Sequence, residues 1–338
     1  MSEIGLIAIG RNEGDRLRRC LESVVGKVRQ VVYVDSGSTD GSVETARSLG
    51  ADVVALDLSI PFTAARARNS GLERLLAISP NLTYVQFVDG DCEVVESWLE
   101  VAQRELEAHP DWAVVCGRRR ERFPEQTIYN KLCDIEWATP IGEAKACGGD
   151  AMMRVVALQK IGGYNPTLIA GEEPELCVRL RQAGWKVYRL EAEMTLHDAQ
   201  MTRFGQWWKR SVRAGHAFAE GSFLHGTRPE RHWVKETRSN WLWGLVIPVT
   251  AIALAIPTRG ISLLLFLGYG LMFYKIYRYM QRIGLPSKDS ALYALFCTIG
   301  KFPNMLGQLK FYRNKLLGQR SSLIEYKGAG SPSRTRNI

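Results

Sequence analysis

The sequence has few cysteines, and these lack the spacing of a disulfide or zinc scaffold. The seven cysteines include no C-x-x-C pair, their number is odd, and several lie within apolar runs. Reduced, buried cysteines have this pattern, whereas disulfide frameworks and structural zinc sites use paired, closely spaced cysteines. The sequence therefore argues against a disulfide-stabilised secreted domain and against a zinc-binding module.

A signal peptide is also missing. Glu3 precedes a short apolar run that ends before Arg11, whereas a signal peptide combines a basic start with a longer apolar core. Internal repeats are absent, and so is a glycine-rich, basic N-terminal loop of the kind that binds a triphosphate. We therefore expect a cytosolic N-terminal domain and regard a nucleotidyltransferase as a weak interpretation.

What the sequence does contain is the composition of a folded protein. Of its 338 residues, 46% are hydrophobic and 23% are charged, and this excludes global disorder. The length fits one large domain with an appendage, or two domains. The formal net charge of +9 indicates anionic partners, which include phosphorylated substrates, acidic lipids and nucleic acids.

The N-terminal part alternates between strand and helix patterns. Short apolar, valine-rich runs predict strands, and apolar residues three or four apart predict helices. The predicted strands span 4–10, 28–34, 51–56, 84–88 and 112–117, and the predicted helical segments span 16–25, 43–49, 61–77 and 96–108. This alternation predicts an α/β fold with a mostly parallel sheet that is covered on both faces.

The strand at 84–88 ends in Asp89-Gly90-Asp91. In an open α/β sheet, ligands bind beyond the carboxyl ends of the strands, so this strand brings two carboxylates to such a cleft. Two aspartates separated by a glycine can hold a hard divalent cation, whose shell is completed by substrate phosphates and water. The alternative is a strand-end turn in which Asp and Gly serve only as turn residues.

The composition changes near residue 239. Residues 239–258 carry no charge, and residues 261–274 form a second apolar run after a turn. The first run has about the length that spans a bilayer. Aromatic and basic residues flank the two apolar runs. This predicts a membrane-embedded hairpin with both ends in the cytosol. The alternatives are a buried hairpin and one that lies in the plane of the membrane.

Beyond the hairpin, residues 301–320 interleave apolar and aromatic residues with lysine and arginine. This mixture is typical of a basic helix on an anionic membrane surface. Nucleic acid is the weaker interpretation because the hairpin adjoins this segment. We expect domains at 1–230, 231–283 and 284–338, the last comprising the basic segment and a loose tail from Gly328.

Four segments stand in one order along the chain. They are Arg11-Asn12-Glu13 after a strand, Asp35-Ser36-Gly37-Ser38-Thr39-Asp40-Gly41-Ser42 after the next, Asp89-Gly90-Asp91, and Gly171-Glu172-Glu173-Pro174-Glu175 at a helix start. Over about residues 4–225, this combination resembles the inverting family 2 glycosyltransferases of GT-A fold. The hairpin and the basic segment resemble those of bacterial membrane-attached members that build surface or extracellular polysaccharide.

The resemblance implies a nucleotide-binding role for five residues. Asp35 would accept hydrogen bonds from the imide of the base, a charge-assisted contact, and Arg11, Asn12 and Glu13 would line the base and ribose. Arg68 would reach phosphate or base, and the alternative is an ordinary solvated arginine.

The resemblance also implies a metal site. It assigns ligation of the metal to Asp91 and contact with ribose or sugar to Asp89. Mg²⁺ or Mn²⁺ at this place neutralises the departing diphosphate. His197, which follows a later strand, matches a histidine that contacts metal or diphosphate in related enzymes, and a structural or surface histidine is the alternative.

The catalytic base of the family is the second acid of a Glu-Asp pair at a helix start. Here the pair is Glu172-Glu173, so the resemblance assigns Glu173 as the base that takes the proton of an acceptor hydroxyl. The alternative is that these acids only interact with the helix dipole. Gly149 and Asp150 match a segment beneath donor sugar and acceptor, and Trp137 is a candidate for stacking on a sugar ring.

We therefore predict a membrane-attached inverting glycosyltransferase, cytoplasmic on the inner membrane, that uses a nucleotide-diphosphate sugar, UDP more than GDP. Its partners would be this donor, a lipid-linked or glycan acceptor and the membrane, without nucleic acid. The Q-x-x-R-W signature of processive members is absent, which favours addition of a single sugar. The alternatives are a polyprenyl-phosphate glycosyltransferase and a catalytically inert sugar-binding scaffold.

Overall fold

The structure is a computed structural model of the chain, and it describes residues 3–319, 322 and 324. The described residues fall into two compact units. Unit 1 consists of the residues up to Gln126 together with Glu136–Gln200, and unit 2 consists of Thr127–Ile135 and the residues from Met201 onward. The expected domain limits at 231 and 284 stay a prediction, and the expected loose tail lies outside the described residues.

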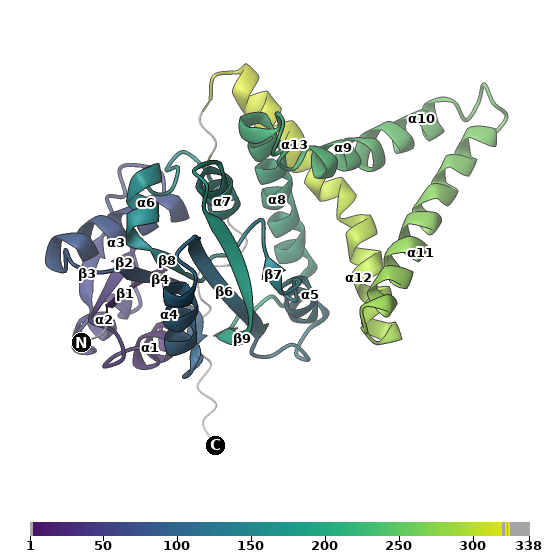
Figure 1. Ribbon diagram of the computed structural model, residues 1–338. Helices are drawn as coiled ribbons and strands as arrows, with labels where there is room; N and C mark the ends of the chain where they lie inside the picture. Colours follow the sequence, from purple (N-terminus) through teal and green to yellow (C-terminus); the bar gives the residue numbers. More distant parts are fainter. Residues whose placement is uncertain (1–2, 320–321, 323, 325–338) are drawn as a thin grey trace. The chain divides into compact units, whose positions relative to one another are not determined.

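Unit 1 is built on a nine-stranded sheet (Figure 1). Its N-terminal half has the order β3-β2-β1-β4, and all of these strands are parallel. The strands are β1 (Ile4–Gly10), β2 (Gln30–Asp35), β3 (Asp52–Ala55) and β4 (Tyr84–Asp89), and the helices between them are α1 (Asp15–Glu22), α2 (Ser42–Ser48) and α3 (Ala64–Ile78). The expected strand–helix alternation of this half is confirmed.

The other half of the sheet mixes strand directions. The order continues through β8, β6, β9 and β5. Strand β8 is antiparallel to both neighbours, β9 is parallel to β6, and β5 and the short β7 pair antiparallel with β9. The parallel arrangement, which was expected from the first hundred residues, does not extend into this half. The elements are β5 (Cys92–Val94), α4 (Trp98–Ala108), β6 (Trp112–Glu121), β7 (Gly142–Glu143), β8 (Ala151–Arg154), α6 (Val155–Ile161), α7 (Glu172–Gln182) and β9 (Lys186–His197).

The core of unit 1 fills both faces of the sheet. Completely buried side chains include Ile7 and Phe87 on the central strands, Leu17 and Leu75 on the covering helices, and Trp98 on α4. Removing each such side chain from water contributes about 1.5–3 kcal/mol. This packing fixes the positions of the strand ends, where the polar residues gather.

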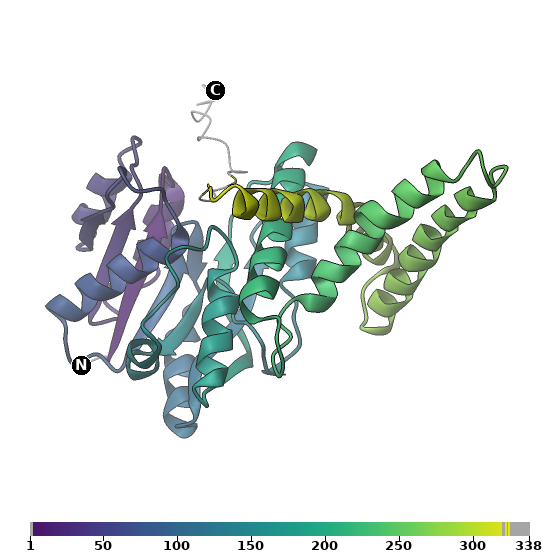
Figure 2. The ribbon, with the colours of Figure 1, turned by 90° about the horizontal axis from the view of Figure 1, so that it is seen from above.

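Unit 2 is helical. Its helices are α5 (Ile128–Glu136), α8 (Phe204–His225), α9 (Val234–Trp241), α10 (Ile247–Ala253), α11 (Leu267–Arg282), α12 (Ser287–Ile299) and α13 (Lys301–Leu316), with short π and 3-10 segments at Leu242–Val246 and Ile261–Phe266. Helix α13 packs along α8 (Figures 1 and 2). A Cβ atom on Gly215 would overlap the backbone of Asn304, and one on Gly307 would overlap that of Val212. The two helices can approach this closely only because both carry glycine at the contact.

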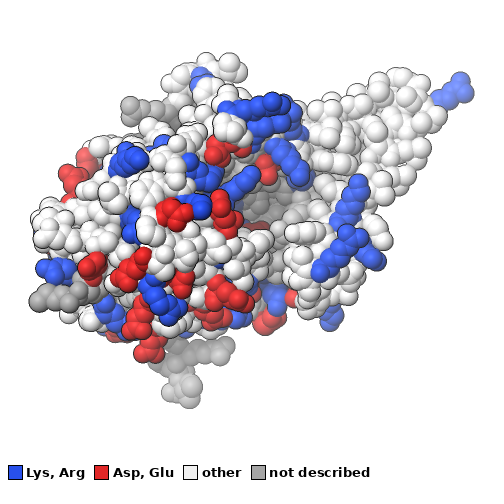
Figure 3. All heavy atoms as spheres, viewed as in Figure 1, with Lys and Arg blue, Asp and Glu red and all other residues white. Residues whose placement is uncertain are grey.

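The two arms of the expected hairpin differ. The second arm, Ile261–Arg282, is the one helix among the described residues that is long and apolar enough to cross a membrane by length and composition. The first arm is shorter than expected, because its helix ends at Ala253 rather than near residue 258. Apolar side chains on both arms are exposed, Ile256 to 92% and Ile261 to 69%. Figure 3 shows arms that are mostly uncharged, with basic residues at the tip and along the lower part of the second arm.

Candidate active site

The loops that follow β1 and β2 are tied together by Asn12. Its backbone N–H donates to Oγ of Ser38 over 2.9 Å, and its side-chain Oδ1 accepts from the N–H of Thr39 over 2.7 Å. Asn12 has a positive φ of 56°, a conformation that asparagine adopts more readily than most residues. Asn12 therefore joins the two loops to which the sequence assigned the nucleotide.

Asp35 ends β2 and is 4% exposed. Its Oδ2 accepts from the backbone N–H groups of Gly37 and Ser38, each over 2.9 Å, and its Oδ1 accepts from the hydroxyl of Tyr33 over 3.1 Å. A carboxylate offers about four acceptor positions. Asp35 is thus held firmly at the strand end and retains an acceptor position on Oδ1 for a ligand N–H group.

Arg11 and Glu13 lie in the loop after β1. Arg11 is exposed, whereas Oε2 of Glu13 lies 2.7 Å from Nη2 of Arg16. The side chain of Glu13 passes beside Gly10 and Gly90, where a Cβ atom would come within 3.0 and 3.4 Å of its Cγ. These two glycines allow Glu13 to lie across the ends of β1 and β4.

Asp89, the last residue of β4, accepts from two arginines. Its Oδ1 is 2.8 Å from Nη2 of Arg68, and its Oδ2 is 3.2 Å from Nη2 of Arg119. Arg68 is 2% exposed and also donates to Oε1 of Glu172 through Nη1 over 2.7 Å. The alternative of a solvated Arg68 is therefore wrong. Because both terminal nitrogens are engaged, the geometry favours a role in positioning Asp89 and Glu172 over direct contact with a phosphate.

Asp150 is completely buried and organises the same cluster. Arg119 binds it with two nitrogens, Nε at 2.9 Å from Oδ2 and Nη2 at 2.7 Å from Oδ1. The hydroxyl of Thr195 donates to Oδ2 over 2.7 Å, and the backbone N–H of Asp89 donates to Oδ1 over 3.0 Å. These donors use the acceptor positions of the carboxylate. The geometry therefore favours a role for Asp150 in positioning Arg119 and Asp89 over the sugar contact that the sequence suggested.

Gly149 lies against this cluster of ion pairs. A Cβ atom on Gly149 would come within 2.9 Å of Nη2 of Arg68, 3.0 Å of Oδ2 of Asp89 and 3.2 Å of Nη2 of Arg119. Any side chain here would push these atoms apart. Glycine is therefore required for the close approach of the loop to Asp89.

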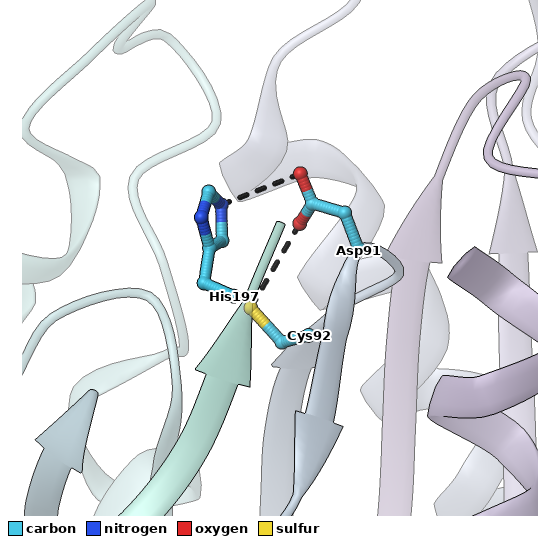
Figure 4. A group of neighbouring side chains, drawn as sticks. All are labelled: Asp91, Cys92 and His197. Atoms are coloured by element: carbon cyan, nitrogen blue, oxygen red, sulfur yellow. Dashed lines mark hydrogen bonds and ion pairs between the residues drawn. The ribbon is translucent and has the colours of Figure 1, made fainter. Parts of the chain in front are cut away.

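Asp91 and His197 face each other across the turn after β4 and the end of β9 (Figure 4). Nε2 of His197 is 3.3 Å from Oδ2 of Asp91, and both side chains are buried. On the other side of the ring, Oε2 of Glu121 lies 3.4 Å from Nδ1. A carboxylate in this position orients an imidazole so that Nε2 is directed at its partner.

Glu173 lies in the first turn of α7, as expected. Its Oε1 accepts from the backbone N–H of Gly148 over 3.1 Å. Burial raises the pKa of Glu173 to about 8, and the negative charge of Glu172 adds to this effect while Arg68 opposes it. A carboxylate with such a pKa is a stronger base than an ordinary one and is matched to neutral pH.

This arrangement of acids at strand ends agrees with the comparison with known proteins. Residues 7–161 match the family described as Glycosyl transferase family 2. Residues 7–161 therefore form a family 2 glycosyltransferase domain. The resemblance to this family that the sequence predicted is confirmed over these residues.

Curated relatives of this glycosyltransferase are distant. Glycosyltransferase AglE of Haloferax volcanii is 23% identical over 217 residues, which are 60% of this chain and 69% of AglE. The pre-mycofactocin glycosyltransferase of Mycobacterium tuberculosis is 26% identical over 228 residues, which are 64% of this chain and 46% of that protein. Succinoglycan biosynthesis protein ExoA of Rhizobium meliloti is 24% identical over 208 residues, which are 56% of this chain and 62% of ExoA. The matched regions therefore cover less than two thirds of the last two relatives.

A solved structure confirms the GT-A fold of the glycosyltransferase. The mannosyltransferase PcManGT from Pyrobaculum calidifontis, in complex with GDP-Man and Mn²⁺, superposes with a TM-score of 0.62 at 18% identity. The superposition covers 93% of this chain and 88% of that one. At this level of identity the likeness concerns the fold.

The glycosyltransferase family implies a divalent cation, and the residues around Asp91 fit one. Donor atoms of Asp91, Cys92 and His197 lie within 4.8 Å of one another. Burial raises the pKa of the Cys92 thiol well above its usual value, so this thiol stays protonated and is a poor ligand. The remaining carboxylate and imidazole suit Mg²⁺ or Mn²⁺ when phosphate oxygens complete the shell.

Trp137, the candidate for sugar stacking, packs on site residues instead. Its ring centroid lies 5.4 Å from the guanidinium carbon of Arg119 and 4.8 Å from the ring of His197, at an interplanar angle of 76°. A tryptophan over a guanidinium is a favourable cation–π contact. Trp137 therefore holds Arg119 and His197 in place.

Three residues of the glycosyltransferase site escaped the sequence interpretation, namely Arg119, Glu121 and Thr195. Strand β6 continues to Glu121, beyond its expected end at residue 117, and β9 runs unbroken to His197. The charged run 118–122 has the composition of a solvated loop. Side chains along a strand point alternately to opposite faces. The placement of Arg119 and Glu121 two residues apart was therefore the signal that could have predicted that both face the site.

Proposed function

We propose that the chain is an inverting, metal-dependent glycosyltransferase that moves a single sugar from a nucleotide-diphosphate sugar to an acceptor at the cytosolic face of a membrane. One observation carries this proposal, the polar network that joins the metal-binding turn to the base. It passes from Asp89, two residues from Asp91, through Arg68 to Glu172, the neighbour of Glu173. A site for the leaving group and a base are thus held by one set of ion pairs.

The donor nucleotide would lie over the ends of β1 and β2. The remaining acceptor position of Asp35 suits the imide N–H of uracil or guanine. Arg11 and Glu13 would line base and ribose, within loops that Asn12 holds together. We favour UDP over GDP, but the similar mannosyltransferase structure contains GDP-Man, so both nucleotides belong in the first test.

Asp91 and His197 would hold the divalent cation, whose charge offsets that of the departing diphosphate. The nitrogen donor favours Mn²⁺ over Mg²⁺, since Mg²⁺ prefers oxygen ligands throughout. Glu121 orients His197 for this purpose. Arg68, Arg119 and Gly149 hold the carboxylate of Asp89 toward the ribose or the donor sugar.

Glu173 would take the proton of the acceptor hydroxyl as its oxygen attacks the anomeric carbon opposite to the diphosphate. This single displacement inverts the anomeric configuration. The hydrogen bond from Gly148 fixes one carboxylate oxygen, and the other is available to the acceptor. The glutamate at this position extends the carboxylate one methylene further than the aspartate of the family.

We place the acceptor at a membrane, as a lipid-linked sugar or a polysaccharide precursor. The exposed apolar arm Ile261–Arg282 is long enough to enter a bilayer, and the basic helix α13 suits an anionic surface. The relative ExoA is named for succinoglycan biosynthesis. We therefore propose residues 231–283 as the membrane hairpin, 284 onward as an interfacial segment, and an inner-membrane location with unit 1 in the cytoplasm.

A polyprenyl-phosphate glycosyltransferase is the second candidate, because the exposed apolar arm would equally bring the enzyme to a polyprenyl lipid. Its nucleophile is a phosphate, which is already ionised and needs little base catalysis. The two candidates therefore differ in their dependence on Glu173.

The decisive experiment measures release of nucleoside diphosphate by detergent-solubilised protein. UDP- and GDP-sugars are tested with Mn²⁺ and Mg²⁺, with and without membrane lipid extract. We expect release from one donor that needs the cation, is lost in Asp91→Ala and falls about 10²–10⁴-fold in Glu173→Gln. Release that persists in Glu173→Gln supports the polyprenyl-phosphate candidate. Absence of release together with absence of donor binding in calorimetry would leave a sugar-binding scaffold.

A further inference from the structure

Arg189 on β9 is a buried arginine without a counterion. It is 7% exposed, and its Nε atom has no hydrogen-bond partner. Within the part of the chain that the structure describes, no carboxylate forms an ion pair with its guanidinium group. Arginine stays protonated in proteins, and a buried charge without a partner is strongly unfavourable. The missing partner is therefore expected to be an anion that the described residues do not supply.

The strand neighbours of Arg189 leave room for such an anion. Strand β9 lies between β6 and β7, and Arg189 pairs with Cys116 on one side and with Gly142 on the other. Both neighbours are small, and the space where a Cβ atom of Gly142 would lie has no atom within 4 Å. Paired residues of neighbouring strands project to the same face of the sheet, so the guanidinium lies between two short side-chain positions.

A second positive charge lies nearby on β6. Burial lowers the pKa of Arg189 from its usual value, and the charge of the adjacent Arg118 lowers it further. Between Cys116 and Arg118 the register of β6 against β9 shifts, and such irregularities re-aim side chains next to active sites. Two guanidinium groups that repel each other bind a doubly charged anion more favourably than a single one.

This pair of arginines belongs to the acceptor side of the site. Arg189 precedes His197 by eight residues on the same strand, which corresponds to roughly 20–26 Å at about 3.3 Å per residue. The diphosphate of a donor held at Asp91 and His197 therefore cannot reach it. Gly142, the strand partner of Arg189 on β7, instead lies six residues before Gly148, whose backbone N–H donates to Glu173.

We propose that Arg189 and Arg118 bind a phosphate or diphosphate group on the acceptor. This inference rests on the proposed transferase function and specifies its acceptor as a phosphate ester. Arginine is suited to this role because its planar group donates two parallel hydrogen bonds to phosphate oxygens. The same chemistry fits a sugar attached to a lipid through diphosphate and a soluble sugar phosphate.

The first test measures binding without turnover. Inorganic phosphate is titrated into the full chain by calorimetry in EDTA, so that no cation recruits phosphate to Asp91. We expect Arg189→Met to weaken phosphate binding at least tenfold and Arg189→Lys to weaken it less. The control Arg120→Met removes an exposed arginine from β6 that pairs with Glu193, and it should bind phosphate as the wild type does.

Thermal denaturation separates a ligand-binding arginine from a structural one. Because none of the residues that the structure describes pairs with Arg189, Arg189→Met should melt at the wild-type temperature or above it. Added phosphate should raise the melting temperature of the wild type but not that of Arg189→Met. Unchanged phosphate binding in Arg189→Met, or a melting temperature several degrees lower without phosphate, would overturn the proposal.

Transfer assays distinguish the two sources of the phosphate. Farnesyl-diphosphate-linked N-acetylglucosamine, N-acetylglucosamine 1-phosphate and the free sugar serve as acceptors with the donor that the wild type uses. A KM raised at least tenfold in Arg189→Met for one phosphorylated acceptor, with the donor KM unchanged, supports the proposal and names the source. An equal KM for that acceptor contradicts it. If no donor is used at all, the proposed transferase function fails, while the phosphate titration still decides the role of Arg189.

Discussion

The backbone N–H of Gly148 donates a 3.1 Å hydrogen bond to Oε1 of Glu173. This contact joins the first turn of α7 to the loop whose next residue, Gly149, lies against the ion pairs of Asp89. The carboxylate is therefore fixed through one oxygen, and Oε2 is the atom that can meet an acceptor.

The pH dependence of transfer should report the ionisation of Glu173. Its pKa is raised to about 8, and only the deprotonated carboxylate can accept a proton. We expect kcat/KM for the acceptor to rise about tenfold per pH unit up to about pH 8 and to level off above it, because kcat/KM reports groups of the free enzyme. A profile that is flat between pH 6 and 9 would rule out Glu173 as the base.

Replacing Glu173 should stabilise the fold while it removes activity. The folded-state pKa lies above the usual value of 4.5, so ionisation opposes folding as the pH rises from about 4.5 to about 8. Glu173→Gln lacks this penalty, so its free energy of unfolding at pH 8 should be about 2 kcal/mol higher than that of the wild type. This is less than the pKa shift would give in full, because the side chain is partly exposed to solvent. The melting temperatures of variant and wild type should coincide near pH 4 and diverge toward pH 8. A variant that is less stable at pH 8 contradicts this account.

Glu121 should control metal binding although it is not expected to contact the cation. Its Oε2 lies 3.4 Å from Nδ1 of His197, and loss of such a contact typically costs about 10–100-fold in metal affinity. Glu121→Gln should weaken Mn²⁺ binding in calorimetry by this factor, and His197→Ala should weaken it at least as much. The control Glu193→Gln changes an exposed carboxylate that pairs with Arg120 and should leave Mn²⁺ binding unchanged.

Gly149 should tolerate no side chain. In Gly149→Ala the methyl group would come within 2.9–3.2 Å of Arg68, Asp89 and Arg119, so the ion pairs must move apart. We expect at least a tenfold loss of donor affinity, measured by calorimetry with the nucleotide sugar and Mn²⁺. Gly205→Ala is the matched control, because a Cβ atom there meets no atom within 4 Å. Equal affinities in the two variants would show that the close approach of the loop is unimportant.

The hairpin should bind membranes through its exposed apolar residues. Ile261 and Leu267 are 69% and 66% exposed, and an aspartate in the centre of a bilayer costs about 2.5–3.5 kcal/mol. The double variant Ile261→Asp, Leu267→Asp should lose flotation with anionic vesicles. Leu58→Asp, at a position that is 64% exposed in unit 1, should float as the wild type does. Unchanged flotation of the double variant would refute membrane insertion of this arm.

The N-terminal half of the fold was predictable because its signals are local. Strands β1, β2 and β4 are short apolar runs, and each is followed by polar residues that must lie at the carboxyl edge of a parallel sheet. Sequence reasoning therefore located Asp35, Asp89 and Asp91 at strand ends. The later strands escaped because β6 ends in a run of charged residues and shifts its register against β9.

The ion pairs of the site were not predictable for a different reason. A sequence does not distinguish a solvated arginine from one whose charge is balanced by distant carboxylates. Arg68 and Glu172 are 104 positions apart, and Arg119 and Asp150 belong to separate strands and loops. Only the assembled sheet brings these partners together. The sequence therefore identified Arg68 and most acids of the site, but it missed Arg119 and Glu121 and gave no sign that Arg68 positions carboxylates.

The glycine contact between α8 and α13 also dictates when unit 2 can form. Gly307 is synthesised roughly ninety residues after Gly215, which takes about 5–20 s at typical rates of translation. During this interval the face of α8 around Gly215, against which Asn304 of α13 packs, has no partner helix. The apolar arms between them are made in the meantime, and under the proposed membrane attachment they would enter the bilayer first. If the arms insert as proposed, the order of synthesis places their insertion before the packing of α13 against α8.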